Sequence, residues 1–191
     1  MPIANFHGQT FVAFADIAGF KSMMTDGKRG PAALDALYQS GYHVISHQPG
    51  DGPRVEGLFV SDCGVLFVRG DQDPPARRLE SLLNAIETLN RRCFEHAVSL
   101  TTAICWGEFS YHERIEIPGI EKNPIYGNAY VSAFIDNEAT SPKLYPNECR
   151  VLKRDLPQDV LDLCTQRQGA IGSRIRDTQH HFYFEWMRRT Q

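Results

Sequence analysis

The sequence lacks any apolar run that could cross a lipid bilayer. Its apolar stretches, such as residues 57–60 and 64–68, are four or five residues long, whereas a membrane-spanning helix needs about 20. Residues 1–7 contain neither the basic start nor the apolar run of a secretory signal. We therefore expect a cytoplasmic protein that does not enter a membrane.

Positive charge is also scarce. The chain has 20 Lys and Arg residues against 23 Asp and Glu residues, which gives a formal net charge of −3. Nonspecific binding to nucleic acid needs a basic excess, so we expect no nucleic-acid partner. The five cysteines are an odd number, and none lies in a Cys-x-x-Cys pair. This argues against a zinc knuckle or a dithiol redox centre and predicts reduced, mostly buried thiols.

The chain nevertheless has enough apolar material for one sizeable core. It has 191 residues, of which 42% are hydrophobic and 23% are charged, and a typical domain has about 100 to 200 residues. No internal repeat, low-complexity tract or linker divides it. We expect residues 1–191 to form a single domain.

The beginning of the chain predicts a strand followed by a helix. An apolar run at residues 10–15 ends at Asp16 and Gly19, as a buried strand does where it leaves a sheet. Pro31 suits the first turn of the following helix. The Pro- and Gly-rich residues 49–53 stop that helix.

Two apolar segments then predict a hairpin. Residues 55–60 and 63–68 are separated only by Ser61 and Asp62, which is typical of buried strands joined by a tight turn. This places Asp62 at the tip.

The second half of the chain predicts a helix, a strand, an arm, a second helix and two strands. The first of these helices is the clearest, because apolar residues recur at helical spacing from Leu79 to Cys93. The other elements are a strand at residues 100–106 ending at Gly107, a loop-like arm with Pro118, Gly119 and Pro124, a helix at about 127–138, and strands at 149–152 and 182–186. This order is that of an α+β, ferredoxin-like split βαβ sheet, which we expect to carry its helices on one face.

Asp16 and Asp62 stand out because each interrupts apolar strand sequence. An ionised carboxylate in such surroundings is costly without a partner. The split βαβ order can bring the end of the first strand beside the hairpin tip, and a divalent cation would then offset the two like charges. In the alternative interpretation, Asp16 caps the turn after its strand and Asp62 accepts backbone hydrogen bonds in the hairpin.

Three segments together resemble the class III nucleotide cyclase family. They are Phe14-Ala15-Asp16-Ile17-Ala18-Gly19-Phe20, the Ser61-Asp62 hairpin, and Tyr126-Gly127-Asn128 before a helix. The resemblance covers a catalytic core at about residues 10–139, with residues 140–191 completing the domain. Within the family, the first segment is most similar to the pyrimidine (uridylate) cyclases of Pycsar antiphage systems.

The resemblance implies a site for two Mg²⁺ or Mn²⁺ ions, held by the catalytic residues Asp16 and Asp62 and by the carbonyl of Ile17. It also implies that the N–H groups of Ala18, Gly19 and Phe20 bind substrate phosphates. Oxygen ligands of this kind suit hard cations.

The implied reaction converts UTP to 3′,5′-cyclic UMP and pyrophosphate, as an antiphage signal for a separate cyclic-nucleotide-responsive effector. The resemblance further implies a homodimer, with the arm at residues 109–122 and the helix at 127–138 as interface surfaces. The alternatives are a cytidylate cyclase making cyclic CMP and a degenerate domain that binds a nucleotide without turning it over.

The sequence departs from purine-specific members of the family. Leu58 and Pro124 stand where those members have a base-reading Lys and Asp, which argues for a smaller base, with Tyr42, Glu56 and Tyr126 as candidate readers.

A second departure concerns the helix at about 127–138. Val131 and Ile135 replace the Asn and Arg that stabilise transition-state charge in familiar members, and residues 127–139 contain no basic residue. The charge must then come from elsewhere, the candidates being Lys21, Arg77, Arg91, Arg92 and Arg114.

Overall fold

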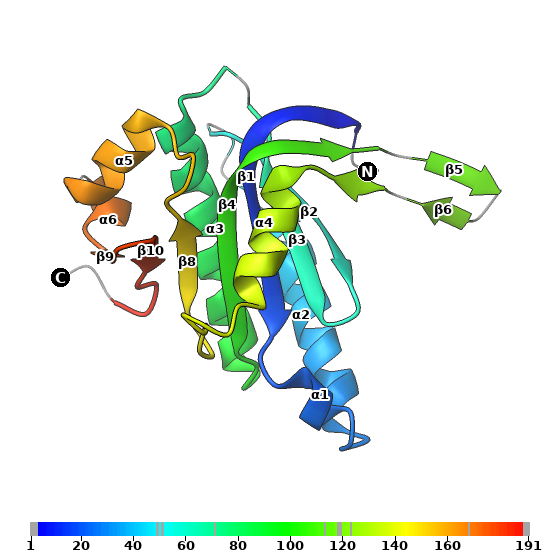
Figure 1. Cartoon of the computed structure of the whole chain (residues 1–191). Coiled ribbons are helices and arrows are strands. Elements are labelled where there is room, and N and C mark those ends of the chain that lie inside the picture. Colours follow the sequence, from blue (N-terminus) through cyan, green and yellow to red (C-terminus); the bar gives the residue numbers. More distant parts are fainter. Residues whose placement is uncertain are drawn as a thin grey trace.

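The computed structural model describes residues 4–48, 50, 52–70, 72–112, 114–117, 120–122, 124–167 and 169–188. The described chain contains a sheet of eight strands in the order β2-β3-β1-β4-β8-β10-β9, with β7 paired to the end of β4 (Figure 1). Neighbouring strands are antiparallel except β4 and β8, which are parallel. The strands are β1 Phe6–Ile17, β2 Val55–Val60, β3 Cys63–Val68, β4 Leu100–Tyr111, β7 Ile125–Tyr126, β8 Cys149–Leu152, β9 Ile175–Asp177 and β10 His181–Phe184.

The order β2-β3-β1-β4 is the split βαβ arrangement that the sequence predicts, and the α+β fold class is confirmed. The predicted hairpin is confirmed as β2 and β3, with Val60 opposite Cys63. The sheet then continues through β8, β10 and β9, so the C-terminal residues extend the same sheet.

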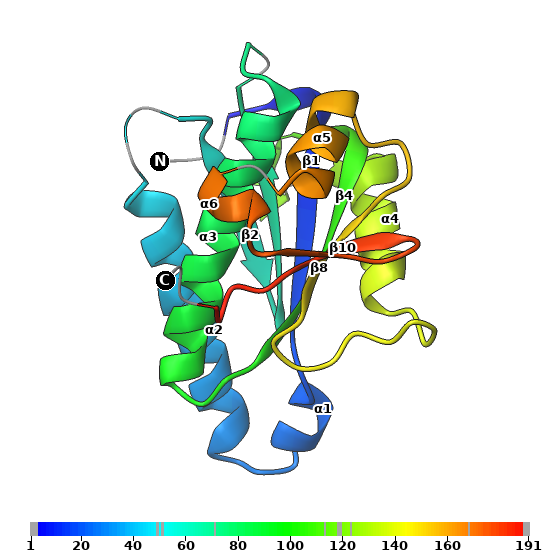
Figure 2. The ribbon, with the colours of Figure 1, turned by 90° about the vertical axis from the view of Figure 1, so that its left-hand side faces the viewer.

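Helices cover both faces of the sheet, which corrects the expectation of helices on one face (Figure 2). Phe11, Ala13 and Ile17 of β1 share one core with α2, α3 and α5, whereas Val12 and Phe14 of the same strand share a second core with α4. Successive side chains of a strand point to opposite faces, so a strand with two apolar faces needs two covering layers. The helices are α1 Phe20–Met23, α2 Arg29–Ser46, α3 Pro75–Glu95, α4 Asn128–Asn137, α5 Gln158–Thr165 and α6 Gly169–Gly172.

The strand expected to end at Gly107 continues to Tyr111. The strand passes close to the start of α4 here, since a Cβ atom at Gly107 would lie 2.3 Å from the Oδ1 atom of Asn128 and 3.3 Å from the backbone nitrogen of Ala129. The glycine therefore marks a close helix–strand contact and not the end of the strand.

The arm is not a loop, which corrects a second expectation. It contains the paired strands β5 (Arg114–Ile117) and β6 (Ile120–Lys122), which project away from the sheet (Figure 1). Pro118 and Gly119 lie outside the described residues.

All five cysteines are free, and four of them are buried, as expected. Among the helices of the described chain, we find none whose length and hydropathy would allow it to span a bilayer.

Candidate active site

The structure brings Asp16 and Asp62 together at one end of the sheet. Asp16 pairs with Cys63 in the β1–β3 register, and the N–H of Ile17 donates to the carbonyl of Asp62 over 3.0 Å. Ser61 adopts a left-handed φ of 54°, which turns the hairpin tightly at this point. Asp16, near the end of β1, therefore lies beside Asp62, in the turn that leads into the adjacent strand β3, as the split βαβ order predicts.

The electrostatics of this end of the sheet are unfavourable for a second negative charge. Burial, followed by repulsion from Asp62 and then from Glu138, raises the pKa of Asp16 from 3.8 to about 7. A carboxylate with so high a pKa lacks a compensating cation, and a bound divalent ion would supply one.

The alternative interpretation as caps and turn acceptors finds no support in the contacts. Gly19, not Asp16, is the N-cap residue of α1, and no side chain caps that helix. Within the described part of the chain, the carboxylate oxygens of Asp16 and Asp62 accept no hydrogen bond and form no ion pair. Both side chains are partly exposed. Their oxygens are therefore available to an external partner.

These oxygens fit a hard divalent cation. The carbonyl of Ile17 adds a third oxygen donor at the same strand end. Two carboxylates and a carbonyl are the ligand types that Mg²⁺ and Mn²⁺ prefer, with the remaining positions open to water and phosphate oxygens. No group of three or more His, Cys, Asp or Glu side chains in the described residues forms a complete metal site.

A cavity of about 310 Å³ opens beside Asp16. Its lining comes from the end of β1, the start of β4, the end of α4 and the loop that follows α4. The residues are Asp16, Ala18, Gly19, Thr101, Asn137, Glu138, Ala139, Thr140, Lys143, Leu144 and Pro146. The cavity could hold a ligand against Asp16, which lies beside Asp62.

The turn after β1 offers fewer phosphate donors than expected. The N–H of Ala18 already donates to the carbonyl of Ser99 over 2.9 Å, which removes Ala18 from the three expected donors. Gly19 has a left-handed φ of 76°. Within the described chain, the N–H groups of Gly19 and Phe20 donate to no other backbone group. The side chain of Phe20 packs in the core under the helices.

Several residues considered as cation sources or base readers are occupied elsewhere. Arg77 pairs with Asp73, and Arg91 pairs with Glu87 and donates to the carbonyl of Trp186. The other predicted residues show the same pattern or lie away from the cavity. Glu56 pairs with Arg69, Tyr42 packs against Phe59, Tyr126 stacks on His112, Arg92 is on α3, Lys21 is on α1, and the side chain of Arg114 lies outside the described residues.

Sequence reasoning missed five polar residues of the cavity: Thr101, Asn137, Glu138, Thr140 and Lys143. The side-chain amide of Asn137 joins α4 to two strands of the sheet. Its Oδ1 accepts from the Thr101 hydroxyl of β4, and its Nδ2 donates to the Phe14 carbonyl of β1, each over 3.3 Å. The only sequence signal for Lys143 was that it is the first basic residue after the cation-free residues 127–142.

A larger cavity, of about 440 Å³, lies between α2 and α3. Its described lining includes His43, His47, Ser81 and Asn84 but no carboxylate. We assign the candidate site to the smaller cavity because Asp16 lines it, beside Asp62, together with several polar side chains.

Comparison with known proteins identifies the fold. No family model matches the sequence, and neither does any curated protein. Solved structures do match. The adenylyl cyclase CyaB from P. aeruginosa is 12% identical with a TM-score of 0.61, and the match covers 95% of each chain. The guanylate cyclase domain of RhGC from Catenaria anguillulae, solved with GTP, is 10% identical with a TM-score of 0.62, over 95% of this chain and 96% of that one.

A third match is a class III adenylyl cyclase-like ATP-binding protein from Pseudomonas aeruginosa. It is 13% identical with a TM-score of 0.60, over 89% of this chain and 38% of that one. The chain therefore has the fold of class III cyclase catalytic domains.

Proposed function

We propose that this protein is a metal-dependent nucleotide cyclase that converts UTP to 3′,5′-cyclic UMP and pyrophosphate. The observation that carries the proposal is the pair formed by Asp16, near the end of β1, and Asp62, in the turn before the adjacent strand β3, with the pKa of Asp16 raised to about 7. Such a pair calls for a divalent cation, and it occurs here in a fold shared with adenylyl and guanylyl cyclases.

In the proposed reaction, the ribose 3′-oxygen attacks the α-phosphorus of UTP. The new 3′-O–P bond closes the ring, the 3′-hydroxyl proton passes to solvent, the bond from the α-phosphorus to the bridging oxygen breaks, and pyrophosphate leaves. Asp16, Asp62 and the Ile17 carbonyl would hold two Mn²⁺ or Mg²⁺ ions, which would lower the pKa of the 3′-hydroxyl and offset the charge of the triphosphate. The N–H groups of Gly19 and Phe20 would orient phosphate oxygens.

The preference for a pyrimidine rests on Leu58 and Pro124. Neither side chain can donate or accept a hydrogen bond, so the purine contacts expected at these positions are absent. The absence of these contacts supports a smaller base, with UTP first and CTP second. Cyclic UMP would act as an antiphage signal for a separate effector.

The proposed active form is a homodimer. Val131, Phe134 and Ile135 of α4 are 49%, 44% and 60% exposed, and an apolar face of this kind is typical of an interaction surface. A second copy placed on α4 would cover it. Twofold symmetry would then give two equivalent sites.

The test is incubation of the protein with each of the four ribonucleoside triphosphates and Mn²⁺, followed by mass detection of cyclic products. We expect cyclic UMP as the main product from UTP. Asp16→Ala and Asp62→Ala should each abolish product while leaving the circular dichroism spectrum unchanged. Faster cyclisation of ATP or GTP would overturn the base assignment, and full turnover by either alanine variant would overturn the metal assignment.

A second candidate function is nucleotide binding without turnover. Val131 and Ile135 favour it, because neither can stabilise charge in a transition state. Binding of UTP with no cyclic product from any of the four nucleotides would select this alternative.

A further inference from the structure

The loop after α4 carries a basic residue into the candidate cavity, and a buried ion pair holds that loop in place. We propose that Lys143 binds the phosphate chain of the substrate and that the Asp136–Arg150 ion pair positions it. The inference rests on the proposed function, since it takes the ligand of this cavity to be a nucleoside triphosphate. Lys143 would give the site a positive charge that neither the sequence motifs nor α4 supplies.

The charges around the cavity create a need for this cation. Asp16 and Glu138 line it, and Asp62 lies beside Asp16, which makes three carboxylates. A bound triphosphate adds about four negative charges, and two divalent cations return four positive ones. The site would remain about three charges negative without a further cation. Lys143 is the only basic residue among the described residues that line the cavity.

The ammonium group of Lys143 is available for this role. Within the described chain, it forms no ion pair or hydrogen bond, and the residue is exposed. Lysines 21 and 28 are exposed as well but do not line the cavity. Lys143 therefore differs from them by its position and not by its chemistry.

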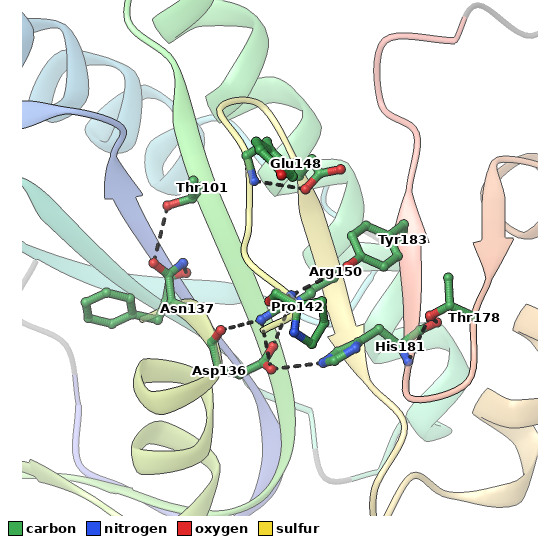
Figure 3. Close-up of polar contacts among 11 residues, drawn as sticks. Thr101, Asp136, Asn137, Pro142, Glu148, Arg150, Thr178, His181 and Tyr183 are labelled. Carbon is green, nitrogen blue, oxygen red and sulfur yellow. Dashed lines mark hydrogen bonds and ion pairs between the residues drawn. The ribbon is translucent and has the colours of Figure 1, made fainter. Parts of the chain in front are cut away.

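Arg150 anchors the chain just before Lys143. Its side chain is fully buried, and its guanidinium contacts both carboxylate oxygens of Asp136, at 2.8 and 3.0 Å (Figure 3). The same guanidinium donates to the carbonyl of Pro142 over 2.7 Å. One side chain thus ties the end of α4 to the residue that precedes Lys143. A pair of buried, charge-assisted hydrogen bonds of this kind fixes geometry well.

His181 and Tyr183 complete the anchor from the neighbouring strand β10. The Nε2 atom of His181 lies 2.9 Å from Oδ1 of Asp136, and the hydroxyl of Tyr183 lies 3.5 Å from Nη1 of Arg150 (Figure 3). Burial alone would raise the pKa of Asp136, but the hydrogen bonds from His181 and Arg150 outweigh it and lower that pKa. Asp136 therefore stays ionised and keeps its hold on Arg150.

The chain after Lys143 is held as well. Leu144 is buried against Ala103 and Tyr183, and the N–H of Asn147 donates to the carbonyl of Leu100 over 2.7 Å. With its backbone fixed on both sides, Lys143 can place its ammonium in the cavity by side-chain rotation alone. Pre-organisation of this kind lowers the entropic cost of binding an anion.

The test measures binding of inorganic tripolyphosphate in the presence of Mn²⁺ by calorimetry, independently of any turnover. We expect Lys143→Gln to weaken binding by about tenfold or more, an effect comparable to losing one charge-assisted contact, and Lys143→Arg to restore most of it. Lys28→Gln, which makes the same change of net charge away from the cavity, should bind as the wild type does. Equal binding by the wild type and Lys143→Gln would overturn the inference.

The positioning role is tested with Asp136→Asn, which keeps the size of the side chain but removes its charge. We expect it to raise the KM for the substrate with little change in kcat, and to weaken tripolyphosphate binding in the wild type but hardly further in Lys143→Gln. Additive effects of the two substitutions would overturn the positioning role. Lys143-dependent tripolyphosphate binding without cyclic product would support the inference while refuting the cyclase proposal. Cyclic product with Lys143-independent binding would do the reverse.

Discussion

Asp16→Asn tests whether the candidate site stores electrostatic repulsion when no metal is bound. The pKa of Asp16 is about 7 in the folded protein and 3.8 ordinarily. At 1.36 kcal/mol for each pH unit, the difference corresponds to at most about 4 kcal/mol. Solvent around the partly exposed carboxylate screens this interaction, so we expect Asp16→Asn to gain about 2 kcal/mol at pH 8 in the presence of EDTA.

The sign of the pH dependence follows from proton linkage. Because the folded state holds the proton more tightly than the unfolded state, the wild type loses stability as the pH rises from about 4 to about 7. The asparagine variant has no such carboxylate. Its advantage should therefore be fully present above pH 7, shrink as the pH falls, and disappear below about pH 4.

The assay is urea unfolding followed by circular dichroism at several pH values in EDTA. In thermal unfolding of a chain of this size, the same 2 kcal/mol corresponds to a rise in Tm of about 4–8 °C. Asp62→Asn is the matched control, and we expect a smaller gain from it because burial, not Asp62, is the largest cause of the raised pKa. Equal stability of the wild type and Asp16→Asn at pH 8 would refute the reasoning.

Addition of Mn²⁺ should stabilise the wild type more than the Asp16→Asn variant. A ligand that binds only the folded state stabilises it in proportion to its affinity, and Asp16→Asn removes one anionic ligand. Mn²⁺ should therefore raise the Tm of the wild type more than that of the variant. A rise of equal size in both would show that Asp16 does not take part in metal binding.

Three further predictions concern the frame around the site. Gly127→Ala should destabilise the fold by about 2 kcal/mol or more in urea unfolding, because φ is +126° and a Cβ would lie 2.3 Å from the Glu108 carbonyl oxygen; unchanged stability would contradict this. Arg150→Met should cost about 3–5 kcal/mol by removing the buried cation from Asp136 and leaving it with His181 alone, and the loss should shrink as acid protonates Asp136; a loss independent of pH would argue against the ion pair. Ile135→Asp should leave the Tm unchanged but give a monomer in sedimentation, whereas an unaltered mass would exclude α4 as an interface.

The elements that the sequence predicts correctly are those with local signals. The hairpin at Asp62 follows from two apolar segments separated by two turn residues, and α3 follows from apolar residues at helical spacing. The position of Asp16 beside the hairpin follows from the split βαβ order alone. Each of these signals lies within one segment of the chain or in the order of segments.

The features that the sequence does not predict depend on how distant segments pack. The apolar residues of α4 occur on both sides of the helix, with Ala129 and Ala133 buried and Ile135 exposed, so periodicity could not show which face of the sheet it covers. Gly107 reads as a strand end because its contact with α4 is not visible in the sequence. The position of the Lys143 loop depends on the buried Asp136–Arg150 pair and on the packing of Leu144, which join residues that no motif links.

The effect of Lys143 on rate separates the two proposed functions. A group that binds substrate and transition state equally changes KM and leaves kcat unchanged, whereas a group that meets charge only as it develops changes kcat. Lys143 lies on the same chain as Asp16, and its ammonium is free to meet the phosphates before any bond breaks, so we expect the KM effect. Charge that develops on the leaving pyrophosphate then needs a further cation, and α4 contains no Lys, Arg or His between Asn128 and Asn137. We expect a cyclase built on this chain to draw that cation from a second copy, as in the proposed homodimer, whereas a nucleotide-binding protein needs no such cation. Turnover that disappears on dilution to the monomer, while Lys143-dependent tripolyphosphate binding persists, is the result that the cyclase proposal requires.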